Sequence, residues 1–120
     1  MENITGIELV AAERTRQVSE EKWHPSNDVK WDRIAPNNLT RAAISYATVP
    51  NTRVMVKVTA ETPEKFGRIP KDFPWGPASW KPTPDDRIRE LVKAAALLVA
   101  QIDVLIAVKN ESTSSEEESK

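Results

Sequence analysis

The sequence predicts a mainly α fold, a small helical bundle of two long helices and one shorter helix, with a proline-rich insertion that can hold one β-hairpin. Apolar residues recur at helical spacing near both ends of the 120-residue chain. All nine prolines fall between Pro25 and Pro84, which confines irregular structure to the middle. With 39% hydrophobic residues, a chain of this length forms one domain with one modest core.

The domain is predicted to cover residues 1–109, with an irregular insertion over about 48–82. The remaining residues, 110–120, are polar and acidic, and we expect them to form a disordered tail.

The first helix is predicted over residues 7–22, because Thr5 and Glu8 fit a capping box and Pro25 ends the helical pattern. Its inward face should be apolar, with Arg14 at the edge: Ile7, Val10, Ala11 and Val18. The opposite stripe alternates in charge and is predicted to be solvated or salt-bridged: Glu13, Arg16, Gln17 and Glu20.

Three elements are predicted in the middle of the chain. A shorter helix over residues 39–47, capped by Asn37 or Asn38, should bury Leu39, Ala42, Ala43 and Tyr46. Alternating valines over residues 54–58 predict a strand, whose best partner in a hairpin is the stretch 65–69. The stiff aromatic segment 73–82 then leads into the last helix.

The last helix is predicted over residues 84–108, with Thr83 as N-cap and Pro84 at its first position. Asp85 and Asp86 place negative charge at the positive end of the helix dipole. The expected core stripe is Ile88, Val92, Ala95, Val99, Ile102 and Ile106, with Leu91, Leu98 and Leu105 beside it. Two partner helices cannot cover so many apolar faces, which favours self-association as a two-fold homodimer.

Composition narrows the functional class. The net charge of −1 gives no general attraction to nucleic acid or to an anionic membrane. Without cysteine there is no disulfide, thiolate nucleophile or cysteine-bound zinc. The N-terminus does not resemble a signal peptide, and the longest uninterrupted apolar run is too short to span a bilayer. We therefore expect a cytoplasmic protein with no membrane or nucleic-acid partner.

Several motifs occur in an order that resembles a small protein family common in bacteriophage and prophage genomes. They lie at residues 13–17, 22–25, 39–47, 73–75, 79–82, 86–94 and 100–103, with Asp28. The resemblance covers most of residues 7–105 except about 50–71, and it implies a phage accessory protein without an established activity. Where the family pattern carries acidic or imidazole groups, this chain has Asn27, Val29, Trp31, Asn38 and Gln101.

Two classes of function stay open. The first is a non-catalytic accessory protein that binds a host protein or sequesters a small, anionic, nucleotide-like ligand, with an anti-defence role. The alternative is an all-α nucleoside triphosphate pyrophosphohydrolase with a degraded metal site, because such enzymes hold magnesium through carboxylates on paired helices. An enzyme of this kind must gather at least three carboxylates in one cleft, whereas a binding protein need not.

The candidate binding residues come from the first helix, the aromatic loop and the start of the last helix. Guanidinium and ammonium groups beside tryptophans can bind an anion and stack a base, although tryptophans such as Trp23 and Trp80 more often pack in the core. The candidates are Arg14, Gln17, Trp23, Asp28, Trp80, Lys81, Arg87 and Lys93. His24, the only histidine, lacks a nucleophile partner, so we predict no catalytic residue, metal or cofactor.

Overall fold

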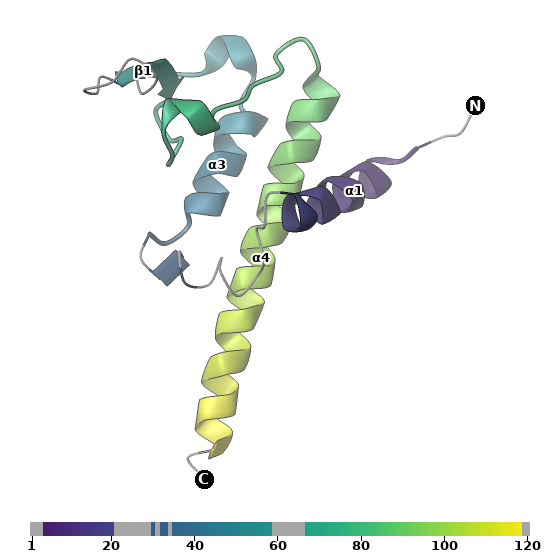
Figure 1. Cartoon of the computed structure of the whole chain (residues 1–120), viewed down its shortest axis with the longest axis vertical. Coiled ribbons are helices and arrows are strands. Elements are labelled where there is room, and N and C mark those ends of the chain that lie inside the picture. Colours follow the sequence, from purple (N-terminus) through teal and green to yellow (C-terminus); the bar gives the residue numbers. More distant parts are fainter. Residues whose placement is uncertain (1–3, 21–29, 31, 34, 59–66, 119–120) are drawn as a thin grey trace.

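The computed structural model describes residues 4–20, 30, 32–33, 35–58 and 67–118. Its three main helices are α1 (Gly6–Ser19), α3 (Asn38–Ala47) and α4 (Arg87–Glu118). A two-stranded antiparallel hairpin of β1 (Met55–Val58) and β2 (Gly67–Pro70) follows α3. Helices α1 and α3 both pack on α4 and flank it on opposite sides (Figure 1). The predicted mainly α fold with one hairpin is confirmed.

Helix α1 begins as predicted but turns the opposite face inward. The Thr5 hydroxyl accepts a hydrogen bond from the Glu8 amide at 3.2 Å. Glu13 and Gln17 are 3% and 1% exposed, whereas Ile7 is 84% exposed. The predicted inward face is therefore wrong. The physical reason is an ion pair that reaches from Glu13 to Arg89 on α4 and makes burial of this carboxylate tolerable.

Helix α3 and the hairpin follow the sequence prediction closely. Leu39, Ala42, Ala43 and Tyr46 are all buried in the core. The preceding Asn37 has a φ of 65°, a left-handed conformation that asparagine tolerates better than most residues. In the hairpin Val56 lies opposite Ile69. The predicted partner stretch is therefore correct over residues 67–69, and residues 65 and 66 lie outside the described part of the chain.

Helix α4 starts later than predicted, at Arg87, because Asp86 caps it. The Asp86 carboxylate accepts a hydrogen bond from the Arg89 amide at 3.0 Å. Thr83 instead opens a turn in which its carbonyl accepts from the Asp86 amide at 2.8 Å. Pro84 fits this turn equally well, because its fixed φ suits the second turn position.

The end of α4 also differs from the prediction. The helix continues to Glu118, through residues that we expected to be disordered. No glycine or proline follows Pro84, so the polar sequence contains no residue that breaks a helix.

The buried face of α4 is the one that carries several alanines, which we call the small-residue face. Leu97 at 1% exposure and Val104 at 0% lie in one core with Ala94 and Ala100. The predicted core stripe is wrong at most positions, because alanines on α4 and on α3 let the two backbones approach closely. Large aliphatic side chains stay between 43% and 68% exposed instead: Ile88, Leu91, Leu98, Ile102, Leu105 and Ile106.

By length and composition alone, residues 87–111 of α4 form a helix that could cross a membrane. Its polar side chains, however, are engaged by the rest of the chain. Gln101 accepts hydrogen bonds from the amide and hydroxyl of Thr40 at 3.2 and 3.1 Å, and donates to Asp32 at 3.1 Å. These contacts attach α4 to the start of α3 and to Asp32 in the segment before it.

Candidate functional site

The structure separates the predicted binding residues into two groups, while Trp23 and Asp28 lie outside the described residues. The first group surrounds Tyr46. The Lys81 amide donates to the Tyr46 hydroxyl at 3.1 Å, and the Lys93 ammonium lies 5.0 Å from the Tyr46 ring centroid. The Trp80 ring stacks on the same tyrosine, with 4.6 Å between ring centroids. Arg87 donates to the Tyr46 carbonyl at 3.2 Å.

Arg14 and Gln17 form the second group, on α1. The Arg14 guanidinium lies 3.5 Å from the Asp103 carboxylate. Asp103 follows Arg87 by more than four helical turns, roughly 24 Å at the usual rise of about 1.5 Å per residue. Arg14 and Arg87 therefore do not converge on one ligand, and the single shared site expected from the sequence is divided.

The group around Tyr46 is organised by a buried carboxylate, Glu90, which is 1% exposed. It pairs with Arg53 at 3.0 Å and with Arg87 at 2.8 Å. Burial alone would raise the pKa of Glu90, but hydrogen bonds from Arg87 and Arg53 outweigh it and lower the pKa below its usual value. The folded protein therefore stabilises the ionised form of Glu90.

Both arginines also close the end of α3. Arg53 donates to the carbonyls of Ser45 at 3.0 Å and Tyr46 at 3.1 Å, and Arg87 donates to the carbonyl of Ala47 at 2.9 Å. The last carbonyls of a helix lack helical partners and carry partial negative charge. This arrangement favours a structural role for Arg87 over the anion contact predicted from the sequence.

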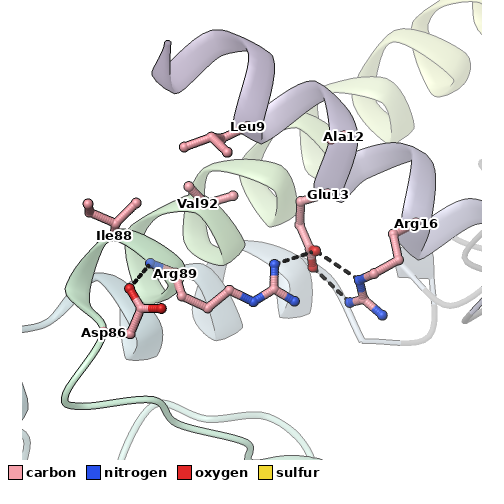
Figure 2. A pocket seen from close by; sticks show the side chains of 8 residues that line it. All are labelled: Leu9, Ala12, Glu13, Arg16, Asp86, Ile88, Arg89 and Val92. Carbon is pink, nitrogen blue, oxygen red and sulfur yellow. Dashed lines mark hydrogen bonds and ion pairs between the residues drawn. The ribbon is translucent and has the colours of Figure 1, made fainter. Parts of the chain in front are cut away.

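A groove lies between α1 and the start of α4, with a volume of about 360 Å³ (Figure 2). Four of the lining residues are apolar and come from both helices: Leu9, Ala12, Ile88 and Val92. The other four are charged: Glu13, Arg16, Asp86 and Arg89. The groove is the best candidate for a functional site, because it combines exposed apolar surface with charges held in fixed positions.

Glu13 holds two of the charged lining residues, Arg16 and Arg89, in place. It accepts two hydrogen bonds from Arg16, each at 2.8 Å, and a third from Arg89 at 2.8 Å. Figure 2 shows Arg89 reaching across from α4 to this carboxylate. Burial acts to raise the pKa of Glu13, yet the hydrogen bonds from Arg16 and Arg89 bring it down to about 2. The predicted salt-bridged stripe is therefore correct for this pair, although Glu13 is buried.

Acid should weaken the contact between α1 and α4. The pKa of Glu13 falls from 4.5 to about 2 on folding, so its contribution is complete above about pH 4.5 and is lost as the pH falls toward 2. At about 1.4 kcal/mol per pKa unit this is up to about 3 kcal/mol of unfolding free energy. Urea unfolding of the protein and of Glu13→Gln should differ at pH 7 and converge near pH 2. A constant difference across this range would contradict the assignment.

Gln17 is buried with neither amide atom hydrogen-bonded within the described part of the chain. An unpaired buried amide costs roughly 1–3 kcal/mol. Gln17→Met keeps the length of the side chain and removes both polar atoms, so we expect it to raise the unfolding free energy by about 1 kcal/mol or more. Chemical denaturation measures this change. A less stable variant would mean that the amide has a partner in the folded protein.

The carboxylate cluster that a metal-dependent hydrolase needs is not seen in the described ranges, where no three acidic or imidazole side chains gather. Two features of the site could not be predicted from the sequence. Arg53 carried no motif, and the pairing of Glu13 with Arg89 joins residues far apart in the chain.

Comparison of the chain with protein-family models, with curated proteins and with solved structures finds no match.

Proposed function

We propose that this protein is a non-catalytic binding module that holds a short amphipathic, acidic segment of a partner protein in the groove between α1 and α4. The combination of an apolar lining with the partly exposed guanidinium groups of Arg16 and Arg89 carries the proposal. An aliphatic side chain of the partner would cover Leu9 and Ala12. An acidic side chain of the same segment would face the two arginines, which are 30% and 38% exposed.

The charges of the groove favour a protein segment over a nucleotide. Glu13 and Asp86 balance Arg16 and Arg89, so the four groups together carry no net charge. A polyphosphate would need an excess of positive charge to offset its own, whereas a single carboxylate can be met by one exposed guanidinium edge. No aromatic residue among those described lines the groove, so a base would find no stacking surface there.

The geometry gives the pyrophosphohydrolase alternative little support. Magnesium in such enzymes is held by several carboxylates that are free to coordinate it. Glu13, the carboxylate of the first family-like motif, already accepts three hydrogen bonds from arginines. Ligation of a metal by Glu13 would require both ion pairs to break.

The resemblance to the phage family supports a proposal for where this protein acts and what kind of partner it binds. An accessory protein of that kind works in the cytoplasm of the infected cell, and its partner would be a host protein. An anti-defence role is the form of this function that the resemblance favours.

Selection from a library of displayed peptides tests the proposal. We expect enrichment of peptides that place an aliphatic residue near an acidic one. Ala12→Arg, which fills the groove, should abolish their binding. Ala11→Arg is the matched control, because Ala11 is also exposed on α1 but does not line the groove.

Three results would count against the proposal. Peptides that bind Ala12→Arg as well as the unchanged protein would place the site elsewhere. Strong thermal stabilisation by a nucleoside triphosphate would favour ligand sequestration. Magnesium-dependent release of pyrophosphate that is lost in Glu13→Gln would establish the enzyme.

A further inference from the structure

A row of side chains along α4 follows the spacing of a coiled coil. Its members follow one another in alternating steps of three and four residues: Ile88, Leu91, Ala95, Leu98, Ile102 and Leu105. The a positions of this heptad repeat are occupied by Ile88, Ala95 and Ile102. All three d positions are occupied by leucine. We refer to these six residues as the α4 seam. Its five large members are between 43% and 68% exposed, so the described part of the chain leaves the row largely open to solvent.

The other sides of α4 are occupied by the two neighbouring helices. Arg89 and Asp103 contact α1, through Glu13 and Arg14. Gln101 contacts the start of α3 through Thr40, and Leu97 lies in the core shared with α3. Apart from Ile88, which lines the groove beside α1, the α4 seam lies on the side of the helix that the described parts of α1 and α3 leave uncovered.

The α4 seam is large enough to be an interface. Five aliphatic side chains, each about half exposed, form a patch of several hundred Å², and apolar patches of this size are often binding surfaces. A standard interface buries about 800 Å² on each partner, and the neighbouring Ile106, 51% exposed, adds to the available area.

We propose that the α4 seam binds the α4 seam of a second copy of this chain, with the two helices antiparallel and the two-fold axis between Ala96 and Leu97. In this register every member of the row meets another member. Ile88 packs on the partner's Leu105, and Leu91 packs on the partner's Ile102. The small Ala95 faces the partner's Leu98, and the two-fold axis repeats each of these layers.

Charge selects the antiparallel arrangement over the parallel one. Lys109 occupies the next position of the repeat after Leu105. In a parallel pair it would face the partner's Lys109, a repulsion between like charges. In the antiparallel register it lies near the turn that precedes the partner's α4, which carries the partner's Asp85 and the partner's Asp86. The contact at each end of the interface is then between opposite charges.

A lipid bilayer fits the same helix less well. A membrane span would place the whole circumference of α4 in hydrocarbon, including Glu90 and Gln101, which are 1% and 4% exposed in the fold. Their partners Arg53 and Thr40 lie on other parts of the chain, so insertion would break these contacts at high cost. A second copy covers the seam and leaves these contacts intact.

The dimer does not depend on the proposed groove. Ile88 is the only residue of the α4 seam that also lines the groove. Ala12→Arg should therefore abolish peptide binding without changing the molecular mass, and substitution of Leu98 should change the mass without filling the groove. The two proposals can fail separately.

Sedimentation velocity of the full chain, from micromolar to millimolar concentration, tests the interface. We expect twice the monomer mass for the unchanged protein. Leu98→Glu places two charges near the two-fold axis and should raise the dissociation constant by at least about 100-fold. Ile44→Glu is the matched control, because Ile44 is an equally exposed aliphatic residue on α3, 48% against 43%, and should leave the mass unchanged.

Disulfide cross-linking tests the relative orientation of the two α4 helices. The chain has no cysteine, so only the introduced cysteines can form a disulfide. Leu91 and Ile102 are separated by three turns of one helix, too far for a bond within one chain. Leu91→Cys combined with Ile102→Cys should give a covalent dimer on oxidation, whereas Leu91→Cys alone should not. This measurement also holds if Leu98→Glu does not fold.

Four outcomes would overturn the proposal. The first is a monomer at all concentrations, and the second is an unchanged dimer in Leu98→Glu. A covalent dimer of Leu91→Cys alone would show parallel helices. Flotation of the unchanged protein with phosphatidylcholine vesicles, lost in Leu98→Glu, would show that lipid and not a second copy covers the seam.

Discussion

Leu97→Ala should lower the free energy of unfolding by about 2–5 kcal/mol, one of the two largest effects expected for a single substitution in this chain. Leu97 is 1% exposed and belongs to the core formed with Leu39, Ala43 and Ala100. Its neighbours include several alanines, whose short side chains cannot move into the space that the leucine leaves. The cavity should therefore stay open, and urea or thermal unfolding would measure its full cost.

The adjacent leucine provides the control. Leu98 is 43% exposed, so Leu98→Ala should lower the free energy of unfolding by well under half as much as Leu97→Ala. Both substitutions are best compared in a monomeric variant such as Ile102→Glu, so that loss of the dimer does not contribute. The sequence pattern alone would have chosen Val99 as the position where a charge unfolds the domain, but Val99 is only partly buried. Equal losses for Leu97→Ala and Leu98→Ala would show that α4 is rotated relative to this structure.

Glu90→Gln should cost about 3–5 kcal/mol, because it leaves buried guanidinium charge without a counter-ion. The side chain of Arg53 is 5% exposed and that of Glu90 is 1% exposed. A glutamine fills the same volume but carries no charge, so packing changes little. Replacing both partners, as Arg53→Met with Glu90→Leu, should recover much of the loss, because no uncompensated charge remains.

The same substitution at an exposed pair separates the effect of burial from that of ion pairing itself. Glu111 pairs with Arg33, and their side chains are 54% and 63% exposed. Glu111→Gln should change the unfolding free energy by less than about 1 kcal/mol. Similar costs at positions 90 and 111 would mean that the Glu90 cluster is open to water.

The elements of the fold could be predicted from local sequence, because their signals are local. The cap at Thr5, the inward residues of α3 and the alternation around Val56 each depend on neighbours a few residues away. The N-cap of α4 was placed at Thr83 instead of Asp86 because both residue types cap helices well and Pro84 suits either geometry.

The faces of the helices could not be predicted in this way. Hydrophobic periodicity assumes that the most apolar stripe is buried within the chain, and here that assumption fails on α1 and on α4. On α1 the decisive contact joins Glu13 to Arg89, far away in the sequence. On α4 close packing against Ala42 and Ala43 favours the small-residue face. The predicted binding residues fall into two groups for the same reason. The motifs do not show which side of α4 each residue contacts.

The guanidinium groups that close the end of α3 bear on the order in which the chain folds. Arg87, which donates to the Ala47 carbonyl, is supplied by α4 and not by α3 or its neighbours. A helix of ten residues is too short to persist alone in water, and α1 likewise has its buried contacts on α4. During synthesis on the ribosome, α1 and α3 would thus emerge without a lasting structure. Stable helices α1 and α3 would form only after α4 has left the exit tunnel, because both pack on the surface of α4.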